Sequence, residues 1–154
     1  MRKLLVAAAL LVACGFSQAG EIFKKSDVKL DENQQAQVEK VKKVPAVVRT
    51  EVFEFNEKAV EGTLTFTLPG GDKVEVKKFM MASVSDDGKV SKGLHWNTED
   101  GEGVINIKDD KRIGGYILQN DKLYSVDTIG TDKKVIVLIT EIDPTKMPKK
   151  KVDD

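Results

Sequence analysis

The chain has 154 residues, and its 25 basic residues balance 25 acidic ones to a formal charge of zero. This length suits one domain with its own core, and the neutral balance excludes a basic nucleic-acid-binding protein. One cysteine and one histidine exclude a disulfide framework, a multi-cysteine zinc site and any site that needs two imidazoles. We therefore expect a non-catalytic protein that binds no metal, no cofactor and no nucleic acid.

The first 19 residues are typical of an export signal. Residues 1–3 form a short basic stretch, and residues 4–13 form an unbroken apolar run. The run is shorter than the roughly 20 residues that span a membrane, but it fits the apolar core of a secretory signal peptide. We expect the protein to be exported to the periplasm or secreted.

Two processing sites compete within this segment. The sequence Ser-Gln-Ala at 17–19 fits ordinary signal peptidase, which would remove residues 1–19 and leave two more acidic than basic residues. The sequence Leu-Val-Ala-Cys at 11–14 instead fits a lipobox, in which Cys14 would be lipidated. This alternative would anchor the protein to the bacterial membrane, and the anchor at Cys14 is the one membrane contact that we expect.

Residues 20–46 are expected to hold a tether and one short helix. Residues 20–30 are polar without a hydrophobic period, which indicates a loose arm. Residues 31–43 favour a helix, because Asp31 can cap the first turn and lysines stand in the last, in line with the helix dipole. The few apolar residues predict a weakly anchored surface helix, which Pro45 would end.

From residue 47 onward the hydrophobic period changes to two, which predicts a β-domain over residues 47–143 followed by a charged tail at 144–154. We expect strands at 48–55, 63–68, 73–80, 82–85, 90–96, 103–107, 113–118, 123–128 and 135–142. Turn sequences rich in Asp, Asn and Gly separate them. This spacing favours a mainly β fold, an antiparallel meander that forms a sandwich or a half-open barrel. Residues 135–139 are apolar on both faces and predict a central strand.

Few residues of this sequence are candidates for catalysis or for metal binding. His95 has no nucleophile or metal partner at a set spacing, so we expect a sheet-surface histidine beside a half-buried Trp96; a small hydrolase around His95 is the alternative. The acidic stretches at 86–88 and 99–103 lack the ligand spacing of a calcium loop, and we expect hairpin turns there. The glycines at 114–115 would let another backbone approach closely, but glycines at a strand start more often mark a bulge.

Residues 47–148, about two-thirds of the chain, carry a series of short motifs. They are a Leu-Pro-Gly-Gly hairpin at 64–76, a Gly-Leu-His-Trp strand at 93–96, a strand pair at 103–107 and 113–117, a Tyr-containing strand at 123–126, and a Glu-Ile-Asp-Pro-Thr segment within 139–148. In this order they resemble the N-terminal pro-domain of secreted bacterial zinc metallopeptidases of the reprolysin-like group (adamalysin-related, including the peptidyl-Asp type).

In that family a catalytic domain with the motif H-E-x-x-H-x-x-G-x-x-H holds zinc, and this sequence lacks the motif. The resemblance therefore implies a pro-domain without its protease, acting in trans as an inhibitor or a folding partner of a secreted zinc metalloprotease. Latency through a zinc-ligating cysteine is not expected, because Cys14 belongs to the export segment. Inhibition would come from steric cover by the sheet or by the tail.

The residues expected at the partner surface are His95, Trp96, Lys146, Met147, Asp153 and Asp154. Asp153, Asp154 or the C-terminal carboxylate would be able to contact the protease metal, since ionised carboxylates are zinc ligands. The alternative to this whole interpretation is a periplasmic or lipid-anchored β-domain with a structural or ligand-binding role and no link to proteases.

Overall fold

A computed structural model describes residues 21–25, 29–56, 59, 63–86, 89–108, 111–131 and 134–147, and of residues 82–86 and 89–91 it describes the backbone alone. The expected export segment with Cys14 and the end of the expected tail with Asp153 and Asp154 lie outside the described residues. The expected helix and strands all fall within them.

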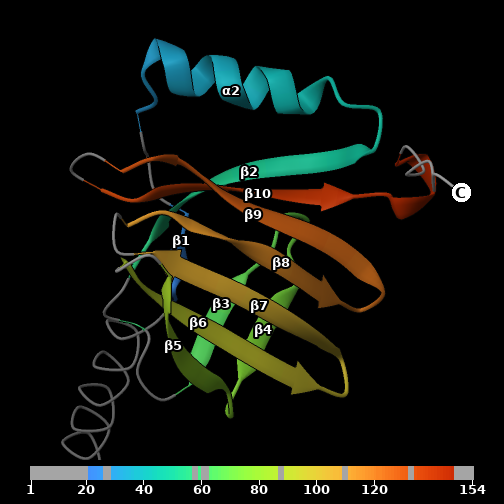
Figure 1. Cartoon of the computed structure of the whole chain (residues 1–154). Helices are drawn as coiled ribbons and strands as arrows, with labels where there is room; N and C mark the ends of the chain where they lie inside the picture. The colour runs from blue at the N-terminus through green and yellow to red at the C-terminus, as the bar shows by residue number, and fades with distance from the viewer. Residues whose placement is uncertain are drawn as a thin grey trace, which may run out of the picture.

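The main element is an eight-stranded antiparallel sheet that curls into a half-barrel (Figure 1). Its strands, in spatial order, are β1 (Phe23–Lys24), β2 (Val47–Phe55), β10 (Ile136–Ile142), β9 (Lys122–Gly130), β8 (Ile113–Gln119), β7 (Gly101–Lys108), β6 (Lys89–Thr98) and β5 (Met80–Asp86). Strands β5 to β10 form a meander, and the earlier strand β2 pairs with β10. The expectation of a mainly β fold, built as an antiparallel meander in a half-open barrel, is confirmed.

A two-stranded hairpin, β3 (Leu64–Thr67) and β4 (Lys73–Val76), packs against one face of this sheet (Figure 1). We call this the inner face of the sheet and the opposite one the outer face. The core lies between hairpin and inner face, where Phe66 makes edge contacts with Phe23 and Trp96 at ring-centroid distances of 5.4 and 5.9 Å. The inner-face side chains of successive strands include Leu94, Ile105, Ile117, Val126 and Ile139.

Helix α2 (Glu32–Lys42) covers part of the outer face (Figure 1). Asp31 accepts a hydrogen bond from the backbone N–H of Gln34, and the Gln34 side chain accepts one from the backbone of Asp31. This reciprocal capping satisfies two backbone donors at the helix start. The helix buries Val38 and contacts β2 and β9, the two neighbours of β10. Six of the seven residues of β10 are buried on alternating faces, which confirms it as a strand covered on both sides.

The segment that we expected to be a loose arm contributes to the core. Ile22 and Phe23 are fully buried, and β1 pairs with the end of β2. The backbone N–H of Ile22 also donates to the carbonyl oxygen of Thr65 in the hairpin, at 3.0 Å. The expectation was wrong for these residues because two apolar side chains among polar ones show no period, and only the tertiary contacts reveal their role.

The two glycines at the start of β8 do not form a bulge, since β8 pairs with β7 and β9 without a register shift. A Cβ on Gly115 would lie 1.9 Å from the carbonyl oxygen of Val104, so this glycine allows β7 to approach closely. A Cβ on Gly114 would meet only the carbonyl oxygen of Val126, at an ordinary 3.7 Å. The bulge expectation was wrong, and packing explains Gly115 but not Gly114.

Candidate functional site

The two adjacent candidates in β6 point to opposite faces of the sheet. His95 is exposed on the outer face, directly opposite Met80 of β5 and Val104 of β7. Trp96 lies on the inner face with 2 % of its surface exposed, and its indole ring packs over Gly103, where a Cβ would lie 2.1 Å from the ring. Contrary to expectation, Trp96 is fully rather than half buried and is not available to a partner in this fold, because strand alternation turns it into the core.

The candidates near the C-terminus lie in a different place. Lys146 ends a short 3₁₀ helix, Pro144–Lys146, and both Lys146 and Met147 are exposed. Asp143 caps this turn by accepting hydrogen bonds from the hydroxyl and the backbone N–H of Thr145, and these bonds hold the pKa of its carboxyl below the usual value. Three strands separate β6 from β10, which leads into this turn. The structure therefore does not bring His95 together with Lys146 and Met147.

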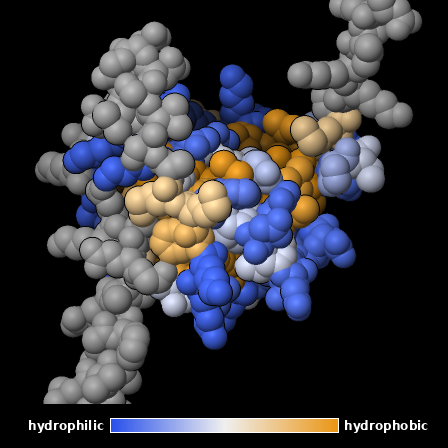
Figure 2. Space-filling model, turned by 60° about the horizontal axis from the view of Figure 1, so that its bottom comes forward, coloured by the Kyte–Doolittle hydropathy of each residue, from blue (hydrophilic) through white to orange (hydrophobic). Residues whose placement is uncertain are grey.

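The edge of the sheet at β5 is the first candidate surface. β5 is the last strand in the sheet order, and no strand of the described residues pairs with its outer edge. Met80 and Met81 at its start are 68 % and 53 % exposed. Figure 2 brings this end of the molecule forward and shows apolar surface between hydrophilic residues. An edge strand of this kind can pair with a strand of another chain.

The apolar surface continues from this edge across the outer face. Register places Met80, His95, Val104 and Tyr116 side by side on four successive strands. Tyr116 and the neighbouring Leu118 are each more than one-third exposed. The main contacts of α2 are with β2 and β9, and on the outer face of β5–β8 the side chains of Met80, His95, Tyr116 and Leu118 are exposed.

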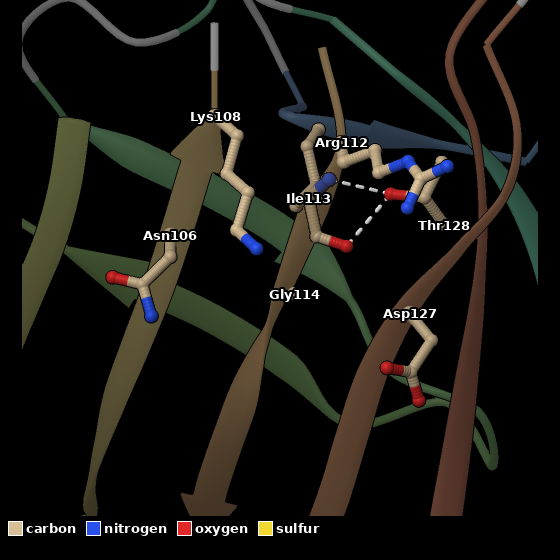
Figure 3. Close-up of a pocket in the computed structure, with 7 residues that line it drawn as sticks. All are labelled: Asn106, Lys108, Arg112, Ile113, Gly114, Asp127 and Thr128. Atoms are coloured by element: carbon tan, nitrogen blue, oxygen red, sulfur yellow. Dashed lines mark hydrogen bonds between the residues drawn. The ribbon is translucent and has the colours of Figure 1, made fainter. Parts of the chain in front are cut away.

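A polar hollow of about 370 Å³ between β7, β8 and β9 is the second candidate (Figure 3). Its floor is Gly114, whose register partners are Asn106 on β7 and Asp127 on β9. Figure 3 shows the ammonium group of Lys108 reaching from β7 toward Gly114, with the carboxylate of Asp127 on the other side of β8. The hollow is therefore flanked by two cations, Lys108 and Arg112, one amide and one anion around a residue with no side chain.

The charges at this hollow are not paired with each other. No ion pair joins Lys108 to Asp127 among the described residues, and neither side chain makes a recorded hydrogen bond there. The pKa of Asp127 is raised above its usual value because the surrounding wall removes water from the carboxylate. Among the described residues, the Asp127 carboxylate makes no ion pair.

Thr128 holds the strands in place beside the hollow. Its hydroxyl accepts a hydrogen bond from the backbone N–H of Ile113 and donates one to the Ile113 carbonyl oxygen (Figure 3). These two bonds extend the connection between β8 and β9 beyond the last paired residues, Gly114 and Asp127. The backbone on both sides of the hollow is therefore fixed by hydrogen bonds.

A third cluster is buried on the inner face. One register row runs from Trp96 through Gly103, Ile117 and Tyr124 to Glu141. The next position along that row is Arg49 of β2. Its Nε lies 3.1 Å from Oε1 of Glu141, so the two side chains form an ion pair, but the geometry is not that of a hydrogen bond. Four buried polar atoms here lack a hydrogen-bond partner within the described residues: Nε1 of Trp96, Oε1 of Gln119, Oη of Tyr124 and Oε1 of Glu141.

Burial controls the protonation of this cluster. Desolvation, and then the negative charges of Glu141 and Asp72, raise the pKa of Tyr124 to about 12. The phenol is therefore neutral at physiological pH. Because Trp96 and Tyr124 belong to the hydrophobic core, we regard the cluster as part of that core rather than as a binding site.

Metal-ligand geometry is not found in the described part of the chain, where no group of three or more His, Cys, Asp or Glu side chains could hold an ion. Of the acidic stretch at 99–103, residues 99–100 form the expected turn between β6 and β7, and residues 101–103 begin β7. Residues 87–88 of the other stretch lie outside the described residues. Among the described residues, no helix is long and apolar enough to cross a membrane.

The sequence did not single out Asn106, Lys108 or Asp127, which flank the hollow. The sequence did indicate that their side chains point outward, because each is a polar residue at an outward position of a strand with alternating burial. What the sequence could not provide is the register that brings these strands together around Gly114. Two residues noted for other reasons, His95 and Gly114, do lie at the apolar surface and at the hollow respectively.

Comparison with family models, with curated proteins and with solved structures finds no match to this chain. The resemblance to metallopeptidase pro-domains therefore rests on the motifs quoted above. The sheet edge at β5, the outer face beside it and the polar hollow are the features from which a function can be inferred.

Proposed function

We propose that this chain is an exported, non-catalytic binding domain that joins a partner protein through the β5 edge. We further propose that the partner is a secreted zinc metallopeptidase, which the chain inhibits or helps to fold. The observation that supports binding is the open edge of β5 with its exposed Met80 and Met81. The order of motifs over residues 47–148 supports the choice of partner.

An open edge favours a protein partner for a physical reason. The outward N–H and C=O groups of an edge strand can form a new ladder with an extended segment, and side chains beside it then select the partner. Proteins usually protect such edges with charges or proline, whereas here two methionines are exposed at the strand start. Methionine side chains adapt to irregular apolar surfaces, which suits a binding edge.

Inhibition would act by steric cover of the peptidase cleft. The row of exposed Met80, His95 and Tyr116, with half-buried Val104 between the last two, gives the edge a contiguous contact surface. A second contribution could come from the tail, where Asp153 and Asp154 are able to bind a metal. These two contributions can be separated, because the tail and the β5 edge can be altered independently.

The test is a titration of the purified chain against a secreted bacterial zinc metallopeptidase of the reprolysin-like group, produced without its own pro-region. Hydrolysis of a fluorogenic peptide and the yield of refolded enzyme are both measured. We expect activity to fall or the refolding yield to rise as the chain is added. Met80→Lys and Met81→Lys should weaken the effect about tenfold or more, since a buried unpaired charge is costly at an interface.

Val48→Lys is the matched control, because Val48 is also an exposed apolar residue on a strand but lies on β2, near the other edge of the sheet. It should leave the effect unchanged. Removal of residues 149–154 tests the tail, and unchanged inhibition would reject a metal contact there. If neither peptidase activity nor refolding yield responds to the chain, the proposal fails and the role is not linked to proteases.

The alternative function is a periplasmic or lipid-anchored ligand-binding domain. The polar hollow over Gly114 is the observation that favours it, because packing does not require a glycine at that position. A peptidase titration without effect, together with ligand binding at the hollow, would support this alternative.

A further inference from the structure

We propose that the hollow over Gly114 binds a small zwitterionic molecule, with its carboxylate toward Lys108 and its ammonium group toward Asp127. This site is on the outer face of β7–β9 and is distinct from the β5 edge. The proposal does not depend on a peptidase partner, so either one can fail without the other.

The hollow has room for a ligand because the residue at its floor, Gly114, has no side chain. Glycine inside a strand is destabilising relative to alanine, and it commonly marks a place where a backbone or a ligand comes close. The backbone explanation applies to Gly115, where a Cβ would collide with Val104. It does not apply to Gly114, where the nearest atom to a Cβ would be 3.7 Å away. A ligand lying on the strand accounts for the second glycine.

The flanking charges define the ligand. An anion alone would meet the carboxylate of Asp127, and a metal cation alone would meet the ammonium group of Lys108 and the guanidinium of Arg112. A molecule with both charges satisfies both groups, which are not paired with each other among the described residues. The amide of Asn106 can donate and accept, so it suits either end of the ligand.

The spacing of the strands limits the size of the ligand. Asn106 and Asp127 face Gly114 from the two neighbouring strands, so their backbones are roughly 9–10 Å apart at a strand spacing of about 4.8 Å. A chain of a few atoms fits between the charged groups. The hydrogen bonds between Thr128 and Ile113 hold the two strands on which the site is built.

The length of the ligand can be measured with a series of probes. The full chain, labelled with ¹⁵N, is titrated with glycine, β-alanine, 4-aminobutyrate and 6-aminohexanoate, and amide shifts are followed by NMR. We expect saturable shifts centred on Gly114, Asp127 and Asn106, strongest for one member of the series. Butyrate and butylamine, which carry one charge each, should bind at least about tenfold more weakly, because each lacks one charged contact.

Three variants test the assignment of the charges. Lys108→Gln and Asp127→Asn should each weaken binding about tenfold or more, and Gly114→Val should abolish it by filling the floor. Lys73→Gln removes an exposed lysine from β4 and should change nothing. Thermal unfolding of each variant shows that it is folded.

Several outcomes would overturn the proposal. Equal binding of butyrate or butylamine would show that a single charge suffices. Shifts that cluster away from the hollow, or that survive both Lys108→Gln and Asp127→Asn, would place the site elsewhere. The absence of saturable shifts with every probe, up to its solubility, would remove the site altogether.

Discussion

Tyr124 and Glu141 are directly opposite each other on β9 and β10, and both face the covered interior of the half-barrel. The carboxylate of Glu141 and the loss of water around the phenol make the tyrosinate unfavourable in the folded state. This pair links the stability of the protein to alkaline pH.

The first prediction concerns that link. The pKa of Tyr124 is about 12 in the folded chain against an ordinary value of 10.0, so the unfolded chain loses this proton first as the pH rises. Its contribution to the free energy of unfolding is complete below pH 10 and is lost between pH 10 and about 12. The loss should approach about 2–3 kcal/mol at about 1.4 kcal/mol per pKa unit.

Urea unfolding at a series of alkaline pH values measures this loss. Tyr124→Phe should reduce the fall in stability across that range, whereas Tyr116→Phe, which changes an exposed tyrosine, should leave it in place. An equal alkaline response of the wild-type chain and Tyr124→Phe would contradict the assignment.

The second prediction compares neighbouring glycines. Gly115→Ala should destabilise the protein by several kcal/mol, because its Cβ would lie 1.9 Å from a backbone oxygen of β7 and the strands would have to separate. Gly114→Ala should change the free energy of unfolding by less than about 1 kcal/mol, since its Cβ has room. Chemical denaturation of both variants provides the measurement, and similar costs for the two would refute the described register.

The third prediction tests whether the N-terminal arm belongs to the core. Phe23 is fully buried among Phe53, Phe55 and Phe66. Phe23→Ala should therefore cost about 3–5 kcal/mol of stability. Lys24→Ala alters the exposed residue next to it and should cost little. A chain that tolerates Phe23→Ala as well as Lys24→Ala would have an arm that is not packed.

The fourth prediction addresses the start of α2. Asp31→Ala removes the side-chain acceptor of the capping box and should lower the free energy of unfolding by about 1 kcal/mol. Because Val38 is the one buried residue of the helix, the effect should appear locally. Amide hydrogen exchange of residues 32–42 should become about fivefold faster, and Asn33→Ala should leave it nearly unchanged.

Much of the local structure could be predicted from the sequence. Alternation of apolar and polar residues is a local property, so strands β5 to β10 lie within a few residues of where the sequence placed them. The turn between β8 and β9 was also visible, because Asn120 and Asp121 tolerate the positive φ angles, 51° and 65°, that a tight hairpin needs. The cap at Asp31 likewise depends on neighbours in the chain.

The sites depended on contacts that the sequence does not contain. His95 and Trp96 are adjacent in the chain, but strand alternation turns His95 outward and Trp96 into the core. Only the direction in which the sheet curls decides which of the two is buried. Ile22 and Phe23 have no local pattern and become core residues through contacts with β2 and the hairpin.

The single cysteine and histidine, the strands and the neutral charge are therefore determined by the sequence alone, since each is a matter of composition or local period. The tertiary structure decided which strand has an open edge, which face α2 covers, and that Lys108, Asn106 and Asp127 meet around Gly114. The physical reason is register: pairing across strands far apart in the chain decides which side chains become neighbours, and that pairing is set by the burial of the whole sheet.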